Sequence, residues 1–189
     1  MTSYIVLDLE FNYPNTRFRS EKNGVVLHEE IIEFGAVKLD EKLNQLDTFC
    51  RFVKPAAYPK VNRDVQELTE ITTEMIWAGE PFEVVVRDFL QWCGDDSAFI
   101  TWSDNDIIAL EDNIGYHGLE VGELPRCFNI QWMFDDQVTQ EDRDFALSYA
   151  MWKLEIKPAP SHDALNDAIN TAEVLRHLDM SEGLEEYEV

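Results

Sequence analysis

The chain has 189 residues, 45% of them hydrophobic, and a formal net charge of −23. The length suits one domain with a substantial core and is short for two. No run approaches the roughly 18 apolar residues of a membrane span, and the N-terminus lacks the basic region of a signal peptide, so we expect a cytoplasmic protein without a membrane partner. The charge disfavours tight binding of long duplexes by counterion release. Cys50, Cys93 and Cys127 are odd in number and widely spaced, which predicts reduced thiols.

Residues 4–12, YIVLDLEFN, are typical of an apolar strand that carries two acids. Strand side chains alternate between faces, so Asp8 and Glu10 are expected to point the same way. Two like charges at a buried strand end need cations or hydrogen-bond donors. A bound divalent metal would satisfy them. The alternative is a frayed strand end with two hydrated carboxylates.

Residues 13–29 have no clear period and contain the densest basic cluster, formed by Arg17, Arg19 and Lys22. This segment is either an arm that touches a phosphate backbone or a mobile hairpin loop. Residues 30–40 and 48–53 predict two further strands, which with the first form an antiparallel meander.

Helices and strands alternate after the meander. We expect short helical turns over 68–76, a helix over 81–93 that Gly94 ends, and a strand over 98–102. A helix follows, terminated by Gly115 or Gly118. Then come a strand running into a turn over 127–134, a helix over 140–154, a stiff loop over 157–161 and a helix over 164–178. Residues 180–189 predict a frayed acidic tail. The order suggests a mixed sheet with helices on its faces and the first strand at its centre.

Asp106 follows the fourth strand at the start of a helix, close to the sheet edge where ligands bind in α/β folds. Asp104 is a competing candidate. The spacing from Ser103 to Asp106 also fits a helix-capping box, which needs no function.

His162 and Asp167 lie five residues apart in SHDALNDA, near the start of the last long helix. This spacing can place an imidazole beside a carboxylate. Alternatively, Ser161 or Asp163 caps the helix and His162 is an ordinary surface residue.

Read together, these motifs resemble the DEDDh 3′–5′ exonucleases of the ribonuclease H-like superfamily, particularly the small-RNA exonucleases and sporulation-inhibitor-like proteins. The resemblance rests on DLEF, EIIEFGAVKLD, LTEIT, WSDND and HDALNDAINTAEVL, in that order over nearly the whole chain. The WSDND motif selects Asp106 over Asp104. Glu70 departs from the family, which usually has glycine at this position of LTEIT, and so does Ser103.

The resemblance implies an α/β fold with a mixed five-stranded sheet, three strands antiparallel and two parallel, flanked by helices. The exonuclease domain would span residues 1–180 and the tail residues 181–189. It implies two Mg²⁺ or Mn²⁺ ions held by Asp8, Glu10, Asp106 and Asp167.

The implied activity is 3′–5′ hydrolysis of single-stranded nucleic acid with a free 3′ end, preferably RNA or short oligonucleotides, releasing nucleoside 5′-monophosphates. His162 would accept a proton from the attacking water, because histidines titrate near about 6.5. Phe11, Leu9 and Leu68 are the candidate substrate contacts.

Two other functions fit the sequence less well. The first is a non-catalytic interaction module on the same fold, suggested by the charge and by Glu70. The second is a phosphatase that uses Asp8 as nucleophile, although D-x-E-F lacks the acid typical of that class and the chain has no obvious lysine motif beside a later acid.

Overall fold

A computed structural model describes residues 3–14, 16–141, 143–160 and 162–189. Its main sheet has six strands in the order β6-β5-β4-β1-β7-β8, and β2 pairs with β3 in a separate hairpin. The strands are β1 (Ser3–Asn12), β2 (Ser20–Lys22), β3 (Val25–Leu27), β4 (Glu30–Leu39), β5 (Gln45–Lys54), β6 (Glu80–Pro81), β7 (Ser97–Thr101) and β8 (Cys127–Asn129). The helices are α1 (Arg63–Thr69), α2 (Thr73–Ala78), α3 (Phe82–Cys93), α4 (Asn105–His117), α5 (Ile130–Phe134), α6 (Leu147–Lys153) and α7 (Ala164–Leu175), with a π-helical turn (Asp135–Thr139) and a 3₁₀ turn (Glu185–Tyr187).

The sheet confirms the expected mixed α/β class. β1 lies inside it, antiparallel to β4 and parallel to β7, and β4 is antiparallel to β5. The two-residue strand β6 adds a sixth member to the five expected strands. It arises because Pro81 is extended before α3 begins at Phe82, so this proline precedes the first helical position.

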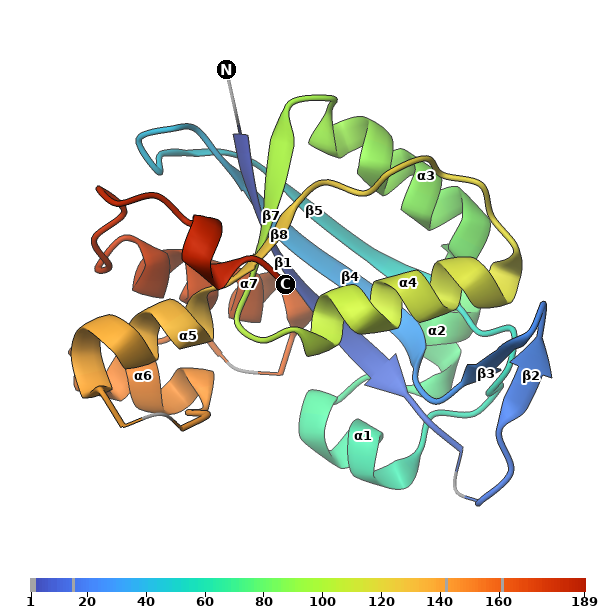
Figure 1. Cartoon of the computed structure of the whole chain (residues 1–189). Coiled ribbons are helices and arrows are strands. Elements are labelled where there is room, and N and C mark those ends of the chain that lie inside the picture. The colour runs from blue at the N-terminus through green and yellow to red at the C-terminus, as the bar shows by residue number, and fades with distance from the viewer. Residues whose placement is uncertain (1–2, 15, 142, 161) are drawn as a thin grey trace.

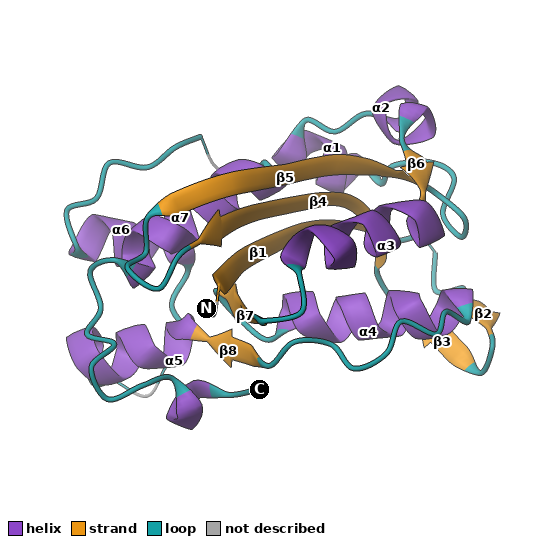
Figure 2. Ribbon diagram, turned by 90° about the horizontal axis from the view of Figure 1, so that it is seen from above, coloured by secondary structure: helices purple, strands orange, loops and turns teal. Residues whose placement is uncertain are grey.

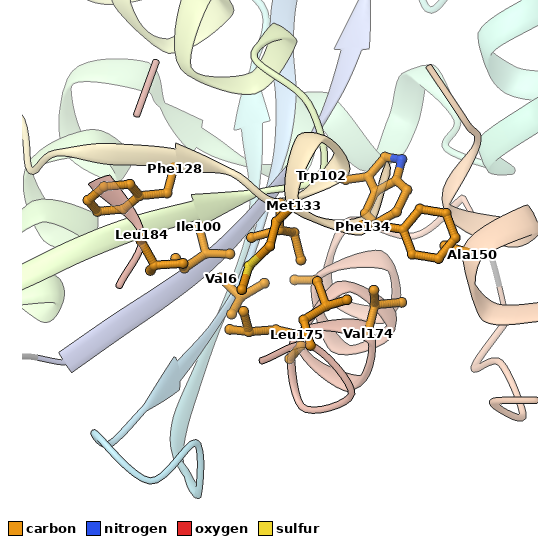
Figure 3. Close-up of a cluster of buried hydrophobic side chains, with 14 of the residues drawn as sticks. Val6, Ile100, Trp102, Phe128, Met133, Phe134, Ala150, Val174, Leu175 and Leu184 are labelled. Carbon is orange, nitrogen blue, oxygen red and sulfur yellow. The ribbon is translucent and has the colours of Figure 1, made fainter. Parts of the chain in front are cut away.

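Helices cover both faces of the sheet (Figure 1). Alternate residues of β1 divide between the two sides. Ile5, Leu7 and Leu9 enter the core shared with α3 and α4. Val6 enters the core shared with α5, α6 and α7. Figure 3 shows this second cluster, in which Val6 lies near Leu175 of α7.

Gly35 lets α7 approach the sheet closely. It is paired with Asp8 across β1 and β4, so both residues face α7. A Cβ added at this glycine would overlap the backbone of Ala164 and Leu165 in the first turn of α7. The missing side chain therefore brings the start of α7 down beside the carboxyl end of β1.

Residues 13–29 include a hairpin that is anchored to α4, and Figure 2 shows β2 and β3 beside the end of this helix. The Ser20 hydroxyl lies 2.7 Å from the Tyr116 hydroxyl, and Asn23 donates to the Tyr116 carbonyl. Lys22 lies over the Tyr116 ring, 5.7 Å from its centroid. These contacts argue against a mobile loop over β2 and β3, whereas Arg17 is exposed and Arg19 half-buried before the hairpin.

Three expected elements differ from the structure. Only Cys127–Asn129 of the expected strand over 127–134 is extended, because the Asn129 side chain accepts a hydrogen bond from the Gln131 amide and starts α5. The expected helix over 140–154 is limited to α6. The helical turns expected over 68–76 form two helices, α1 and α2, separated where Glu70 adopts a left-handed conformation with φ 62°.

The last residues pack against the sheet, although a frayed tail was expected. The Val189 amide donates to the Cys127 carbonyl, and Glu188 forms a bridge with Phe128. Arg126 holds the Glu188 carboxylate through its Nε at 2.7 Å. These contacts with β8 keep the acidic segment in place. No helix in the described ranges is long and apolar enough to span a bilayer.

Candidate active site

Three carboxylates from two distant parts of the chain meet beside the carboxyl end of β1. Asp8, Glu10 and Asp167 offer oxygens that all lie within 4.8 Å of one another. Asp8 and Glu10 are two residues apart on one face of β1, as strand alternation predicts. Asp167 lies in the first turn of α7, which Gly35 seats against that face.

Asp106 reaches the same site from α4, which follows β7. It is 7% exposed, and its Oδ1 accepts a hydrogen bond of 2.9 Å from the Leu9 amide, in the middle of the D-x-E segment. The expected capping box is absent at this described helix start: the Ser103 hydroxyl instead accepts from the Asn105 amide. Asp104 is the N-cap residue, but its side chain forms no capping hydrogen bond. The structure therefore favours Asp106 over Asp104 as the acid beside β1.

His162 lies in the loop before α7. Its backbone has φ 64°, and its amide donates a 2.7 Å hydrogen bond to Asp167 Oδ2. Asp163 is the N-cap of α7, and its side chain accepts a hydrogen bond of 2.9 Å from the Asn166 amide. Of the two caps expected from the sequence, Asp163 is therefore confirmed. Ser161, the other candidate cap, lies outside the described residues. His162 is exposed and lines the same cavity as Asp8 and Asp167.

Burial raises the pKa values of Asp8, Glu10 and Asp106, and repulsion from neighbouring acids adds to the rise. Burial, followed by the charges of Asp106 and Asp167, raises the pKa of Asp8 well above its ordinary value. Burial and the nearby Asp167 raise the pKa of Glu10 to about 8. Burial raises the pKa of Asp106 to about 7, although the hydrogen bond from the Leu9 amide opposes the rise. No ion pair found in the described ranges includes any of these carboxylates.

A fifth acid, Glu33, was not singled out from the sequence. It is 2% exposed on β4, paired with Glu10 across the strands, and its carboxylate accepts from the Ala164 amide at the start of α7. Burial and the charge of Asp163 raise the pKa of Glu33 to about 7. The signal was present in EIIEFGAV, where a charged residue interrupts an apolar strand as Asp8 does in β1.

The three candidate substrate contacts differ in burial. The Leu9 side chain is buried in the core shared with α3 and α4, and only its amide takes part in the site, through Asp106. Phe11 packs against that same core and is partly buried. Leu68 is exposed on α1. Glu70, in place of the usual glycine, has the positive φ that glycine adopts at least cost.

A central β1 bearing Asp8 and Glu10, with Asp106, His162 and Asp167 around it, forms an acidic site at the carboxyl end of the strand. A family model described as Exonuclease matches residues 5–175, and the chain belongs to this family.

Two relatives are similar in sequence. The probable 3′-5′ exonuclease KapD of Bacillus subtilis is 25% identical over 191 residues, covering 92% of this chain and 83% of KapD. Human ERI1 exoribonuclease 2 is 29% identical over 173 residues, covering 76% of this chain but only 24% of the human protein.

Among solved structures, the nuclease domain of 3′hExo, a DEDDh family member bound to rAMP, superposes with a TM-score of 0.79 at 20% identity. The match covers 97% of this chain and 94% of that domain. The fold of this chain is therefore that of a DEDDh nuclease.

Proposed function

We propose that this protein is a two-metal-ion 3′–5′ exonuclease that shortens single-stranded nucleic acid, preferably RNA or short oligonucleotides, and releases nucleoside 5′-monophosphates. The proposal rests chiefly on one observation. Asp8, Glu10 and Asp167 bring oxygens within 4.8 Å of one another, with Asp106 coupled electrostatically to Asp8. Family membership and the DEDDh fold support the same activity.

The residues present fit a pair of divalent cations. Carboxylate oxygens are the ligands that Mg²⁺ and Mn²⁺ prefer. The repulsion that raises the pKa values of Asp8 and Glu10 is what a bound cation would relieve. Asp8, Glu10 and Asp167 would hold one ion, and Asp8 with Asp106 the other. Such ions stabilise the negative charge that develops on the attacking and leaving oxygens of a phosphodiester.

His162 is proposed as the general base. It lines the cavity beside Asp8 and Asp167, and its own amide binds Asp167, which fixes the loop relative to the carboxylates. The imidazole would accept the proton of the attacking water. A proton acceptor held in this way typically contributes about 10²–10⁴-fold to the rate.

The test is a 5′-labelled single-stranded oligonucleotide incubated with Mg²⁺ or Mn²⁺, with and without a blocked 3′ end. RNA and DNA versions are compared. We expect stepwise shortening from an open 3′ end and none from a blocked one. Asp8→Asn, which preserves shape but removes the charge, is expected to abolish shortening.

Calorimetric titration with Mn²⁺ separates this proposal from a non-catalytic module. A folded protein that neither binds the metal nor shortens any oligonucleotide would favour the module and end the nuclease proposal.

A further inference from the structure

A cavity of about 470 Å³ joins the candidate active site to α6. Asp8, His162 and Asp167 form one side of it. The facing side is apolar and includes Leu147, Met151, Trp152 and Ile156. The carboxylates therefore open onto a surface suited to a flat apolar group.

Trp152 is the unusual member of this wall because its residue is 70% exposed. A tryptophan on a packed helix normally buries most of its large ring. Its neighbours on α6, Ala150 and Met151, are buried and hold the helix against the core. The exposed indole is thus carried by a well-anchored helix at the rim of the cavity.

Two features fix the position of this ring. The Phe145 carbonyl, just before α6, accepts hydrogen bonds from Trp102 Nε1 at 2.9 Å and from Gln131 Nε2 at 2.7 Å. From Phe145 an aromatic row continues to Tyr149, with ring centroids 4.5 Å apart, and from Tyr149 to Trp152, 5.6 Å apart. One side of the indole therefore meets a ring that is itself tied to the core, which lowers the entropic cost of binding.

The charges near Trp152 favour a phosphate-bearing ligand. Lys153 and Lys157 are both exposed, with Glu155 between them. Within the described ranges neither lysine forms an ion pair. Residues 152–157 therefore hold two lysines against one glutamate, in a chain with a net charge of −23.

We propose that Trp152 is a stacking platform for a nucleobase of the substrate, within the last nucleotides next to the bond that is cut. This inference rests on the proposed function, since the substrate phosphate at Asp8 sets which base reaches α6. Stacking accepts any base because every base has a π face. Trp152 would thus support binding of the 3′-terminal segment without sequence preference.

The test compares the wild type with Trp152→Ala and Trp152→Phe. The matched control is Trp132→Ala on α5, because Trp132 is also exposed but lines a separate cavity with Asp136 and Asp144. Each protein is assayed on a short oligonucleotide and on the same oligonucleotide with abasic sites at its last three positions.

We expect Trp152→Ala to raise KM about 10-fold on the normal oligonucleotide, within the range of measured stacking contributions, with kcat little changed. On the abasic substrate the wild type should already have the higher KM, and the substitution should add nothing. Trp152→Phe should keep most of the affinity, and Trp132→Ala should match the wild type.

Fluorescence anisotropy with an oligonucleotide carrying 3′ phosphorothioate linkages gives a readout without turnover. Equal affinities of the wild type and Trp152→Ala, or an equal loss on both substrates, would overturn the stacking role. If the wild type shortens no oligonucleotide, the proposed function fails, and the anisotropy comparison still decides whether Trp152 binds a base.

Discussion

The metal-free protein should be less stable at alkaline than at acid pH because of the buried carboxylates. Glu10 shows the effect most clearly, since burial and the charges of Asp167 and Glu33 raise its pKa from 4.5 to about 8. A raised folded-state pKa means that the folded protein holds a proton that the unfolded chain releases. Between about pH 4.5 and pH 8 the free energy of unfolding therefore falls as pH rises.

The size of the effect follows from these values. For one carboxyl group with these two pKa values, raising the pH from 5 to 8.5 lowers the free energy of unfolding by roughly 4 kcal/mol. Glu10 keeps partial contact with solvent, and screening reduces the change to roughly 2–4 kcal/mol. For a chain of this length that corresponds to a fall of about 4–16 °C in Tm.

The assay is thermal unfolding followed by circular dichroism in EDTA across this pH range. Glu10→Gln is the control, because glutamine has nearly the shape of glutamate but does not titrate. The remaining charges of the chain are the same in both proteins. The wild type should lose stability with pH more steeply than Glu10→Gln, and Mn²⁺ at pH 8.5 should restore the wild type far more than the variant. If the stability of the two proteins fell in parallel as pH rose, the view that these carboxylates repel one another until a cation binds would be refuted.

His162→Ala should slow turnover by about 10²–10⁴-fold at pH 7 and by less at pH 9, where hydroxide replaces the lost base; equal losses at both pH values would contradict the role. Gly35→Ala should lower the free energy of unfolding by about 2 kcal/mol or more in denaturant titrations and reduce turnover, because the added methyl meets the backbone of α7. Gly115→Ala in α4, where the nearest atom is a side-chain methyl, should be near neutral in the same titrations. If the segment before the hairpin contacts phosphates, replacing Arg17 and Arg19 together by alanine should weaken oligonucleotide binding and flatten the dependence of its affinity on salt. An unchanged slope of affinity against salt would exclude that contact.

The sequence was most informative where acidic residues interrupt an otherwise apolar strand. Asp8 and Glu10 were predicted on one face from strand alternation, and cations were expected because acids are costly in an apolar strand. The structure places both acids within reach of Asp167. The same logic would have identified Glu33, which interrupts β4.

Elements that depend on tertiary contacts were harder to predict. The helix expected over 140–154 was drawn from spaced apolar residues, but Phe145 is buried before α6 begins, with its carbonyl bound by Trp102 and Gln131. Apolar spacing indicates burial and does not by itself show that the backbone between buried residues is helical. Likewise, the close packing at Gly35 depends on a helix that begins about 130 residues later, which no local pattern reveals.

The docked C-terminal segment has a practical consequence for handling the protein. β8 is the outermost strand on its side of the sheet, and residues 188 and 189 pair with its outer edge. Unpaired backbone groups at a sheet border are templates for intermolecular strand addition. Removing residues 185–189, or displacing them with a fused tag, would uncover that border and favour self-association, so an affinity handle is better placed at the other end.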